Sequence, residues 1–166
     1  MADHVDRVLA QWRVERPDLD PTPMGVVGRI SRAARLLERR LSANFARYGL
    51  QQHEFDMLAT LRRSGHPYRL TAGALLTASM VTSGAITNRV DKLAAKGLVT
   101  RETDPSNRRS VLITLTDRGR RLVDEVLVAH VAREAELLAV LTPRDRQQLA
   151  RILRNLLEAL GDTPDP

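Results

Sequence analysis

Cysteine is absent from this 166-residue chain, and other residue types that carry chemistry are scarce. Without a thiol the chain forms no disulfide, senses no oxidant through sulfur and has little scope for a zinc finger. The four histidines, at positions 4, 53, 66 and 130, lack the spacing of metal ligands, so neither a metal nor a cofactor is expected. We also find no glycine-rich phosphate loop and no convincing histidine–carboxylate pair, which argues against an enzyme.

Long apolar runs are also missing. No stretch approaches the ~20 residues that a membrane span needs, and no signal peptide is visible, so we expect a cytoplasmic protein. Arginine, in contrast, is abundant: Lys92 and Lys96 are the only lysines among 26 basic residues, which outnumber 20 acidic ones to give a net charge of +6. This balance favours a polyanionic partner, because the planar guanidinium group suits phosphates and guanine edges.

The segment from 71 to 116 carries the most informative pattern. It predicts a first helix, capped by Thr71 and running to Leu76, and a second helix, opened by Thr82 or Ser83 and closed by Lys96-Gly97. Two strands follow over 98–103 and 110–115, and a polar hairpin over 104–109 joins them. A helix, a turn, a second helix and a two-stranded ribbon form a winged helix-turn-helix. We therefore expect double-stranded DNA as the partner.

The second helix of this motif has one apolar face and one polar face. At about 100° per residue, Ile86, Val90 and Leu93 point into the domain, while Gly84, Asn88 and Asp91 lie opposite. Short hydrogen-bonding groups near the helix start are suited to the major groove, and we predict four of them as DNA contacts: Thr82, Ser83, Thr87 and Asn88. Alternatively, Thr82 or Ser83 only caps the helix.

The hairpin tip carries Arg108 and Arg109 beside a tight turn. A ribbon tip of this kind can place an arginine in the minor groove, where the potential is most negative. We expect one arginine to enter the groove, with Arg109 preferred, and the other to brace the hairpin by pairing with Asp104. The alternative is a pair of fully solvated arginines.

Helices are expected on both sides of the motif. Before it, the pattern predicts a helix over 3–14, whose apolar residues are Val5, Val8, Leu9 and Trp12. A long helix begins at an N-cap formed by Thr22 with Pro23 after it and ends at Gly49. A helix over 51–63, with Phe55, Leu58, Ala59 and Leu61 inward, and a minor strand over 68–70 follow. The long helix has an apolar stripe of Ile30, Ala34, Leu37, Leu41, Phe45 and Tyr48.

Two more helices follow the motif. The first begins at 116–119, and its apolar side has Leu122, Val126, His130, Leu137 and Leu141. The second begins at Thr142-Pro143 and stops at Gly161, and its apolar residues are Leu149, Ile152, Leu153, Leu156 and Leu160. The apolar surface exceeds what a small lobe can cover, so we expect a homodimer. The expected fold is a mainly α winged helix-turn-helix with a small β-hairpin wing and long terminal dimerisation helices. The dimerisation region covers 1–48 and 117–161, the DNA-binding lobe covers 50–116, and a tail covers 162–166.

The runs TSGAITNRVDKLAAKG and GLVTRETDPSNRRSVLITLTDRGRRL resemble the MarR family of bacterial transcriptional regulators. The resemblance covers nearly the whole chain, because the flanking helices match that family's dimerisation arms. It implies a homodimeric repressor of a pseudo-palindromic operator. One departure is Asn107, where the family usually has an aspartate before the arginines, so a wing salt bridge through position 107 is in doubt.

A narrower resemblance links Trp12, the phrase ERPDLD and the segment HEFDML to the urate-responsive branch of the family. By position, the resemblance implies an anion pocket formed by Trp12, Asp56, Arg89 and Arg101. A small aromatic or carboxylate anion, such as urate, salicylate or a tricarboxylic acid, would stack on Trp12, compete for the arginines and lower DNA affinity.

Structural roles are the alternative for these four residues. Trp12 could be a core anchor, Arg89 could touch a phosphate, and Asp56 with Arg89 could form a purely structural pair. The chain would then be a ligand-independent or architectural DNA-binding protein. A helical interaction module that never meets DNA would leave Arg108 and Arg109 without a role.

Overall fold

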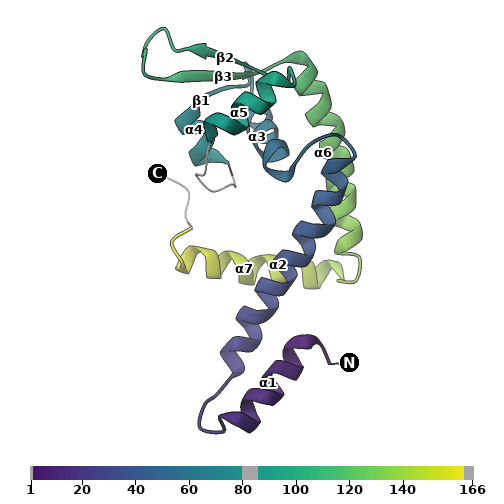
Figure 1. Ribbon diagram of the computed structural model, residues 1–166. Helices are drawn as coiled ribbons and strands as arrows, with labels where there is room; N and C mark the ends of the chain where they lie inside the picture. The colour runs from purple at the N-terminus through teal and green to yellow at the C-terminus, as the bar shows by residue number, and fades with distance from the viewer. Residues whose placement is uncertain (1, 80–85, 163–166) are drawn as a thin grey trace.

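The computed structural model describes residues 2–79 and 86–162, and this part of the chain is mainly helical with a small antiparallel sheet (Figure 1). The elements are α1 His4–Glu15, α2 Thr22–Ala46, α3 Gln52–Arg63, β1 Arg69–Thr71, α4 Ala72–Ala78, α5 Ile86–Ala95, β2 Val99–Thr103, β3 Val111–Leu115, α6 Asp117–Leu137 and α7 Pro143–Ala159. The predicted fold class is confirmed. The start of the second motif helix lies outside the described residues.

Threonine side chains cap three helices, including the predicted caps at Thr71 and Thr142. The hydroxyl oxygens of Thr71, Thr116 and Thr142 accept hydrogen bonds from the backbone N–H three residues later, at 3.1, 3.0 and 3.2 Å. Each bond satisfies one of the N–H groups that a helix leaves unpaired in its first turn. Helices α4, α6 and α7 therefore begin where the sequence predicted.

The predicted cap at Thr22 is wrong. Thr22 is already the first residue of α2, and its hydroxyl donates to the carboxylate of Asp20 at 2.6 Å instead of accepting from the helix. Asp20 also accepts the backbone N–H of Thr22 at 3.0 Å. A carboxylate two residues upstream is the stronger acceptor, so it takes both donors of Thr22.

Glycines in the left-handed region end two helices as predicted. Gly49 and Gly97 have φ of 68° and 67°, a conformation that glycine adopts without strain. Beyond them Leu50 N–H donates to the Phe45 carbonyl at 3.1 Å, and Leu98 N–H donates to the Leu93 carbonyl at 3.0 Å. The chain thereby turns sharply into α3 after α2, and into β2 after α5.

The sheet has the strand order β1-β3-β2, with both pairs antiparallel. In the wing, Val99 is opposite Leu115 and Thr103 is opposite Val111. Both wing strands match their predicted ranges to within one residue, and the predicted minor strand is present as β1 on the other side of β3.

The main core lies in the lobe formed by α3, α4, α5, the sheet and the first half of α6. Its fully buried side chains are Phe45, Met57, Leu58, Leu61, Leu75, Leu93, Ile113, Val123 and Val126. The prediction that Phe55, Leu58 and Leu61 point inward is confirmed, whereas Ala59 is half-buried. Through Val123 and Val126, α6 belongs both to this lobe and to the helical arms.

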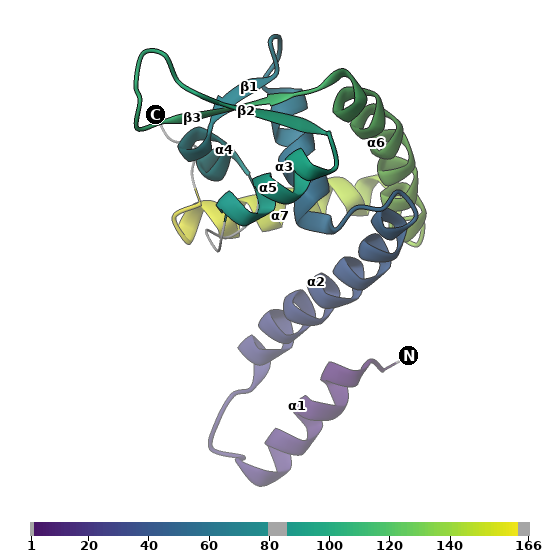
Figure 2. The same ribbon diagram turned by 45° about the horizontal axis from the view of Figure 1, so that its top comes forward.

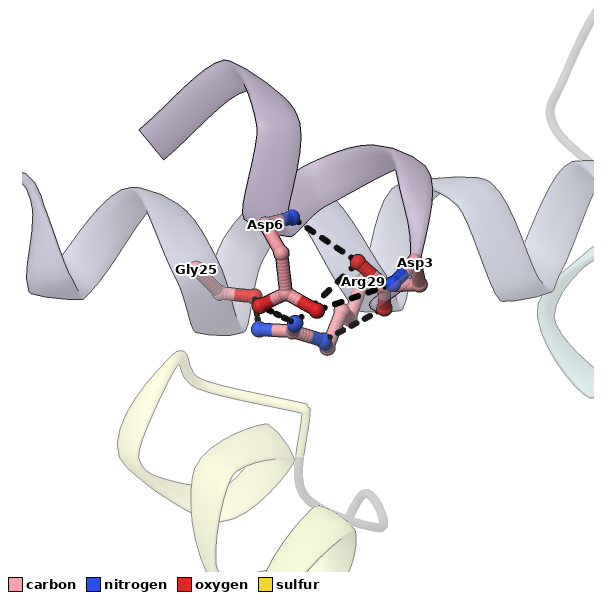
Figure 3. Close-up of polar contacts among 4 residues, drawn as sticks. All are labelled: Asp3, Asp6, Gly25 and Arg29. Atoms are coloured by element: carbon pink, nitrogen blue, oxygen red, sulfur yellow. Dashed lines mark hydrogen bonds and ion pairs between the residues drawn. The ribbon is translucent and has the colours of Figure 1, made fainter. Parts of the chain in front are cut away.

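The N-terminal arm extends away from the lobe in both views, with α1 folded back along α2 (Figures 1 and 2). Val5 and Leu9 of α1 are buried, and Gly25 of α2 allows the close approach, because a Cβ there would lie 3.1 Å from Leu9 Cδ1. Arg29 of α2 adds a polar clasp: its guanidinium donates to Asp3 at 2.8 Å and to Asp6 at 2.6 Å (Figure 3).

Much of the apolar surface of the arms stays uncovered within one chain. Ile30 and Leu37 of the predicted stripe on α2 are 37% and 38% exposed, and Phe45 is its one buried large residue. Helix α7 has no buried residue, although Leu149, Ile152, Leu156 and Leu157 lie along it. The period of the stripe was predicted, but a single chain does not bury it.

Candidate nucleic-acid interface

Helix α5 presents one apolar and one polar face, as predicted. Val90 and Leu93 are buried in the lobe and Ile86 is half-buried. Thr87 and Asn88 are exposed on the other side and lie near the beginning of the described part of the helix. The other two predicted contacts, Thr82 and Ser83, lie outside the described residues.

A buried ion pair that the sequence reasoning missed fixes the other end of this helix. Lys96, just after α5, donates to both carboxylate oxygens of Glu54 at 2.7 Å and to the carbonyl of Gly49 at 2.9 Å. The Glu54 carboxylate also accepts the backbone N–H of Gln51 at 2.8 Å. One lysine thus ties the end of α5 to the start of α3 and to the turn after α2.

The environment of Glu54 favours its charged form. Its side chain is only 3% exposed, and burial by itself raises the pKa of a carboxyl. The hydrogen bonds from Lys96 and the Gln51 N–H, with the positive charge of Lys96, outweigh burial and lower the pKa of Glu54 below its ordinary value. Glu54 is therefore ionised at neutral pH.

A second ion pair joins α5 to the wing. Arg101 of β2 donates to the carboxylate of Asp91, on the exposed side of α5. Both side chains are more than one-third exposed, so the pair is a surface contact of modest strength. The pair connects α5 directly to the first strand of the wing.

The wing tip is braced by small polar residues. Asp104 accepts from the backbone N–H and the hydroxyl of Ser106, at 2.9 and 2.7 Å, and Ser106 lowers the pKa of this carboxyl. Asn107 accepts the backbone N–H of Arg109 at 3.1 Å. Among the described residues neither arginine pairs with Asp104, so the predicted pairing is wrong; Ser106 instead hydrogen-bonds one oxygen of that carboxylate within the same turn. Arg108 and Arg109 are both exposed.

The residues predicted for the anion pocket are only partly brought together. Asp56 of α3 and Arg89 of α5 are both half-buried on neighbouring helices of the lobe. Burial, and after it the positive charge of Arg89, lower the pKa of His53, which precedes Asp56 on α3. Arg101 is paired with Asp91.

Trp12 lies apart from the other three within one chain. It is 43% exposed on α1, which packs against α2 and lies away from the lobe in both views (Figures 1 and 2). It is therefore not a core anchor of the single chain. Within one protomer, α1 packs on α2 and does not bring Trp12 to the three predicted pocket residues of the lobe.

Across residues 2–79 and 86–162, no group of three or more His, Asp or Glu side chains is arranged to hold a metal ion. None of the helices in this same portion combines the length and the apolar character that crossing a membrane requires.

Comparison with known proteins agrees with this geometry. Residues 48–110, which include α3, α4, α5 and most of the wing, match the model of the MarR family. The transcriptional regulator PecS of Dickeya dadantii is 40% identical over 149 residues, which cover 90% of each chain. These relatives are transcriptional regulators and not enzymes, as the sequence predicted.

Solved structures show the same fold. Sco3205, a MarR family regulator from Streptomyces coelicolor in complex with DNA, aligns with a TM-score of 0.77 and 27% identity over 89% of this chain and 95% of its own. Bordetella bronchiseptica BpsR, whose DNA binding is regulated by 6-hydroxynicotinic acid, aligns with a TM-score of 0.65 and 25% identity over 76% of this chain and 91% of its own. The chain belongs to the MarR family of DNA-binding transcriptional regulators.

Proposed function

We propose that this regulator is a homodimeric repressor that binds a pseudo-palindromic operator and releases it when a small aromatic or carboxylate anion binds. Residues 50–116 form the DNA-binding lobe, and residues 1–48 and 117–161 form the dimerisation region, followed by a tail over 162–166. Two lobes related by a two-fold axis meet two half-sites about one helical turn apart.

The uncovered apolar face of α7 carries the dimer proposal. Leu149, Ile152 and Leu156 of this helix are 43%, 49% and 40% exposed, and none of its residues is buried. An isolated amphipathic helix of this length is marginal in water, so packing must stabilise it. A second copy supplies the same apolar faces on α2 and α7, which makes a self-complementary interface possible.

In the complex, α5 enters the major groove and the wing tip reaches the minor groove. Thr87 and Asn88, with Thr82 and Ser83 before them, contact base edges. Arg108 and Arg109 are exposed at the wing tip, and Arg109 is our choice for the minor groove. The Glu54–Lys96 pair keeps the end of α5 in place while its beginning faces DNA.

We propose Trp12, Asp56, Arg89 and Arg101 as the residues that hold the anion, with urate, salicylate and tricarboxylic acids as candidates. In the dimer, α1 of one protomer lies beside the lobe of its partner, so the anion is bound between arm and lobe. The anion draws Arg89 from its resting contacts and changes the spacing of the recognition helices. The regulation of BpsR by an aromatic carboxylic acid supports this ligand class.

Selection from a DNA pool, followed by binding assays across a salt series with each candidate anion, tests the proposal. We expect a palindromic site, affinity that falls with salt, and release by one anion. Asp56→Ala and Arg89→Ala should prevent release at the wild-type anion concentration. Release unchanged in either variant would refute the pocket, and selective binding unaffected by every anion would favour a ligand-independent regulator. A monomer in sedimentation would refute the dimer.

A further inference from the structure

An apolar groove of about 580 Å³ lies between α1 and α2, on the arm that extends away from the lobe (Figure 2). Val5 and Leu9, which are buried, and the half-buried Val8 line it from α1. Met24 and Val27 line it from α2 and are 49% and 63% exposed. Within the described chain, none of the residues that we assign to DNA or to the anion pocket lines this groove, so it is a separate surface.

The groove is apolar at one end and positively charged at the other. Arg32 and Arg35 also line it from α2. Because an α-helix rises about 1.5 Å per residue, Arg35 lies about 16 Å along α2 from Met24. Beside the two arginines is a second hollow of about 160 Å³, which they line together with Leu36 and Arg39. The groove therefore leads from an apolar channel to a group of three arginines.

The charges of Arg32 and Arg35 are not neutralised within the described part of the chain, where neither residue has an ion-pair partner. The two carboxylates at the start of α1, Asp3 and Asp6, bind Arg29 instead, at 2.8 and 2.6 Å (Figure 3). An anionic ligand would supply the missing counter-charge, because planar guanidinium groups hold a carboxylate through paired hydrogen bonds.

We propose that the groove between α1 and α2 binds a fatty acid. The carboxylate is held by Arg32 and Arg35. The alkyl chain lies along Val8, Met24 and Val27. A long ligand with one charged end matches this arrangement, whereas a compact polar anion would leave the apolar end uncovered. The volume of the groove is within the range of small-molecule sites.

A second protomer is the other candidate for an apolar surface on α2, but the stripe that we assign to the dimer is on a different side of this helix. At about 100° per residue, Met24 and Ser31 of the groove lie roughly 120° around α2 from Ile30 and Leu37 of the stripe. A copy of this chain also has a net charge of +6, so it brings no general excess of acidic groups to three arginines. The charge therefore favours a fatty acid over a second copy.

Calorimetric titration of the full chain with hexanoate, octanoate and decanoate, in the absence of DNA, tests the proposed site. Affinity should rise about fourfold for each added methylene, and octan-1-ol should bind more weakly than octanoate because it lacks the charge. Arg32→Gln combined with Arg35→Gln should weaken octanoate binding by about 10- to 100-fold. Arg40→Gln combined with Arg47→Gln removes the same charge from exposed positions outside the groove and should leave the affinity unchanged.

The apolar end of the groove is tested by a matched pair of variants. Val27→Asp places a charge beside the alkyl chain and should weaken octanoate binding by at least about tenfold. Val26→Asp changes the neighbouring position, which is 59% exposed and does not line the groove, and should bind as the wild type does. Octanoate should also slow amide exchange in α1 but not in α3. Circular dichroism confirms that each variant is folded.

The proposed site is wrong if none of the three fatty acids binds, if affinity does not depend on chain length, or if each variant loses no more affinity than its control. Dissociation of a dimer by Val27→Asp, with no octanoate binding to the wild type, would assign the groove to a second copy instead. Operator selection requires no fatty acid, so DNA affinity measured in parallel distinguishes failure of the groove from failure of the proposed repressor.

Discussion

Replacing Lys96 by methionine should destabilise the protein more than replacing Glu54 by glutamine, although both changes remove the same ion pair. The side chain of Glu54 is 3% exposed, whereas that of Lys96 is 39% exposed. Without Lys96, the carboxylate stays buried with one remaining hydrogen bond, from the Gln51 N–H. Without the Glu54 charge, the ammonium still reaches water and the Gly49 carbonyl.

The magnitudes follow from this asymmetry. Leaving a fully buried charge unpaired costs about 3–5 kcal/mol, and the solvent access of this pair reduces the expected cost of Lys96→Met to about 2–3 kcal/mol. Glu54→Gln loses a charged hydrogen bond but keeps a polar side chain, so we expect about 1 kcal/mol. For a chain of this size, the melting temperature should fall by about 4–12 °C in the first variant and about 2–4 °C in the second.

Acid should reduce the difference in free energy of unfolding between the wild type and Lys96→Met. The Glu54 pKa is lowered in the folded wild type, so its stabilisation is complete above the ordinary value of 4.5 and is lost as pH falls through the folded-state pKa. In Lys96→Met the cation that opposed burial is gone, so the carboxyl takes up a proton more readily. Below pH 4.5 the variant is relieved of its buried charge while the wild type loses its ion pair.

Urea denaturation at pH 7 and pH 4, followed by far-ultraviolet circular dichroism, measures these differences. The protomer concentration must be held constant, because the dimerisation that we propose would contribute to the apparent stability. Lys92→Met, which removes the other lysine from an exposed position on α5, is the matched control and should cost little. Equal losses for the two variants at pH 7, or a Lys96→Met protein as stable as the control, would refute the asymmetry.

Three further perturbations test other parts of the molecule. Arg109→Ala should weaken operator binding and reduce the salt dependence by about one ion, as measured by a salt series; an unchanged slope would exclude a contact with DNA. Gly119→Ala should cost about 3 kcal/mol or more in urea denaturation, because a Cβ there overlaps the Leu98 carbonyl, whereas Gly73→Ala meets nothing within 4 Å and should be neutral or slightly stabilising. Arg29→Gln should speed amide exchange in α1 but not in α3. If α1 exchanges at the same rate in Arg29→Gln as in the wild type, the contacts of Arg29 with Asp3 and Asp6 are dispensable.

Local features of the fold were predictable because their causes are adjacent in sequence. Thr71, Thr116 and Thr142 cap helices through atoms three residues away, and Gly97 ends α5 through its own backbone freedom. The failure at Thr22 is also local in origin, since Asp20 competes for the hydroxyl. Likewise, the hydrogen-bond partner of Asp104 is Ser106, two residues later in the sequence Asp-Pro-Ser-Asn, whereas we expected an arginine to pair with Asp104.

Contacts between distant segments were not predictable in the same way. The spacing of Gln51 and Glu54 resembles a capping box, and this signal could have identified their hydrogen bond. Nothing in the sequence pattern linked Glu54 to Lys96, 42 residues away, because that contact depends on how α3 packs against α5. The pair of Arg101 with Asp91 likewise exists only after the wing has folded beside α5.

The arms show what a single chain leaves undetermined. The apolar stripe on α2 has the predicted helical period, but Ile30 and Leu37 remain partly exposed because no other element of the described chain covers them. For the same reason, the four predicted pocket residues do not converge in one protomer, since Trp12 is on an arm and the other three are in the lobe. Their convergence is part of the dimer that we propose.

In the regulator that we propose, contacts between arms and lobe would let an anion bound far from DNA change operator affinity. Arg62 of α3 donates to Asp124 of α6 at 2.7 Å, and Lys96 binds the Gly49 carbonyl at the end of α2. Helices α2 and α6 are therefore both connected to the lobe by charged hydrogen bonds. Since α3 also holds Glu54, a change in the spacing of α2 and α6 reaches the end of α5 through two separate connections. A ligand needs only to prefer one spacing of the two helices in order to bias the position of the recognition helix.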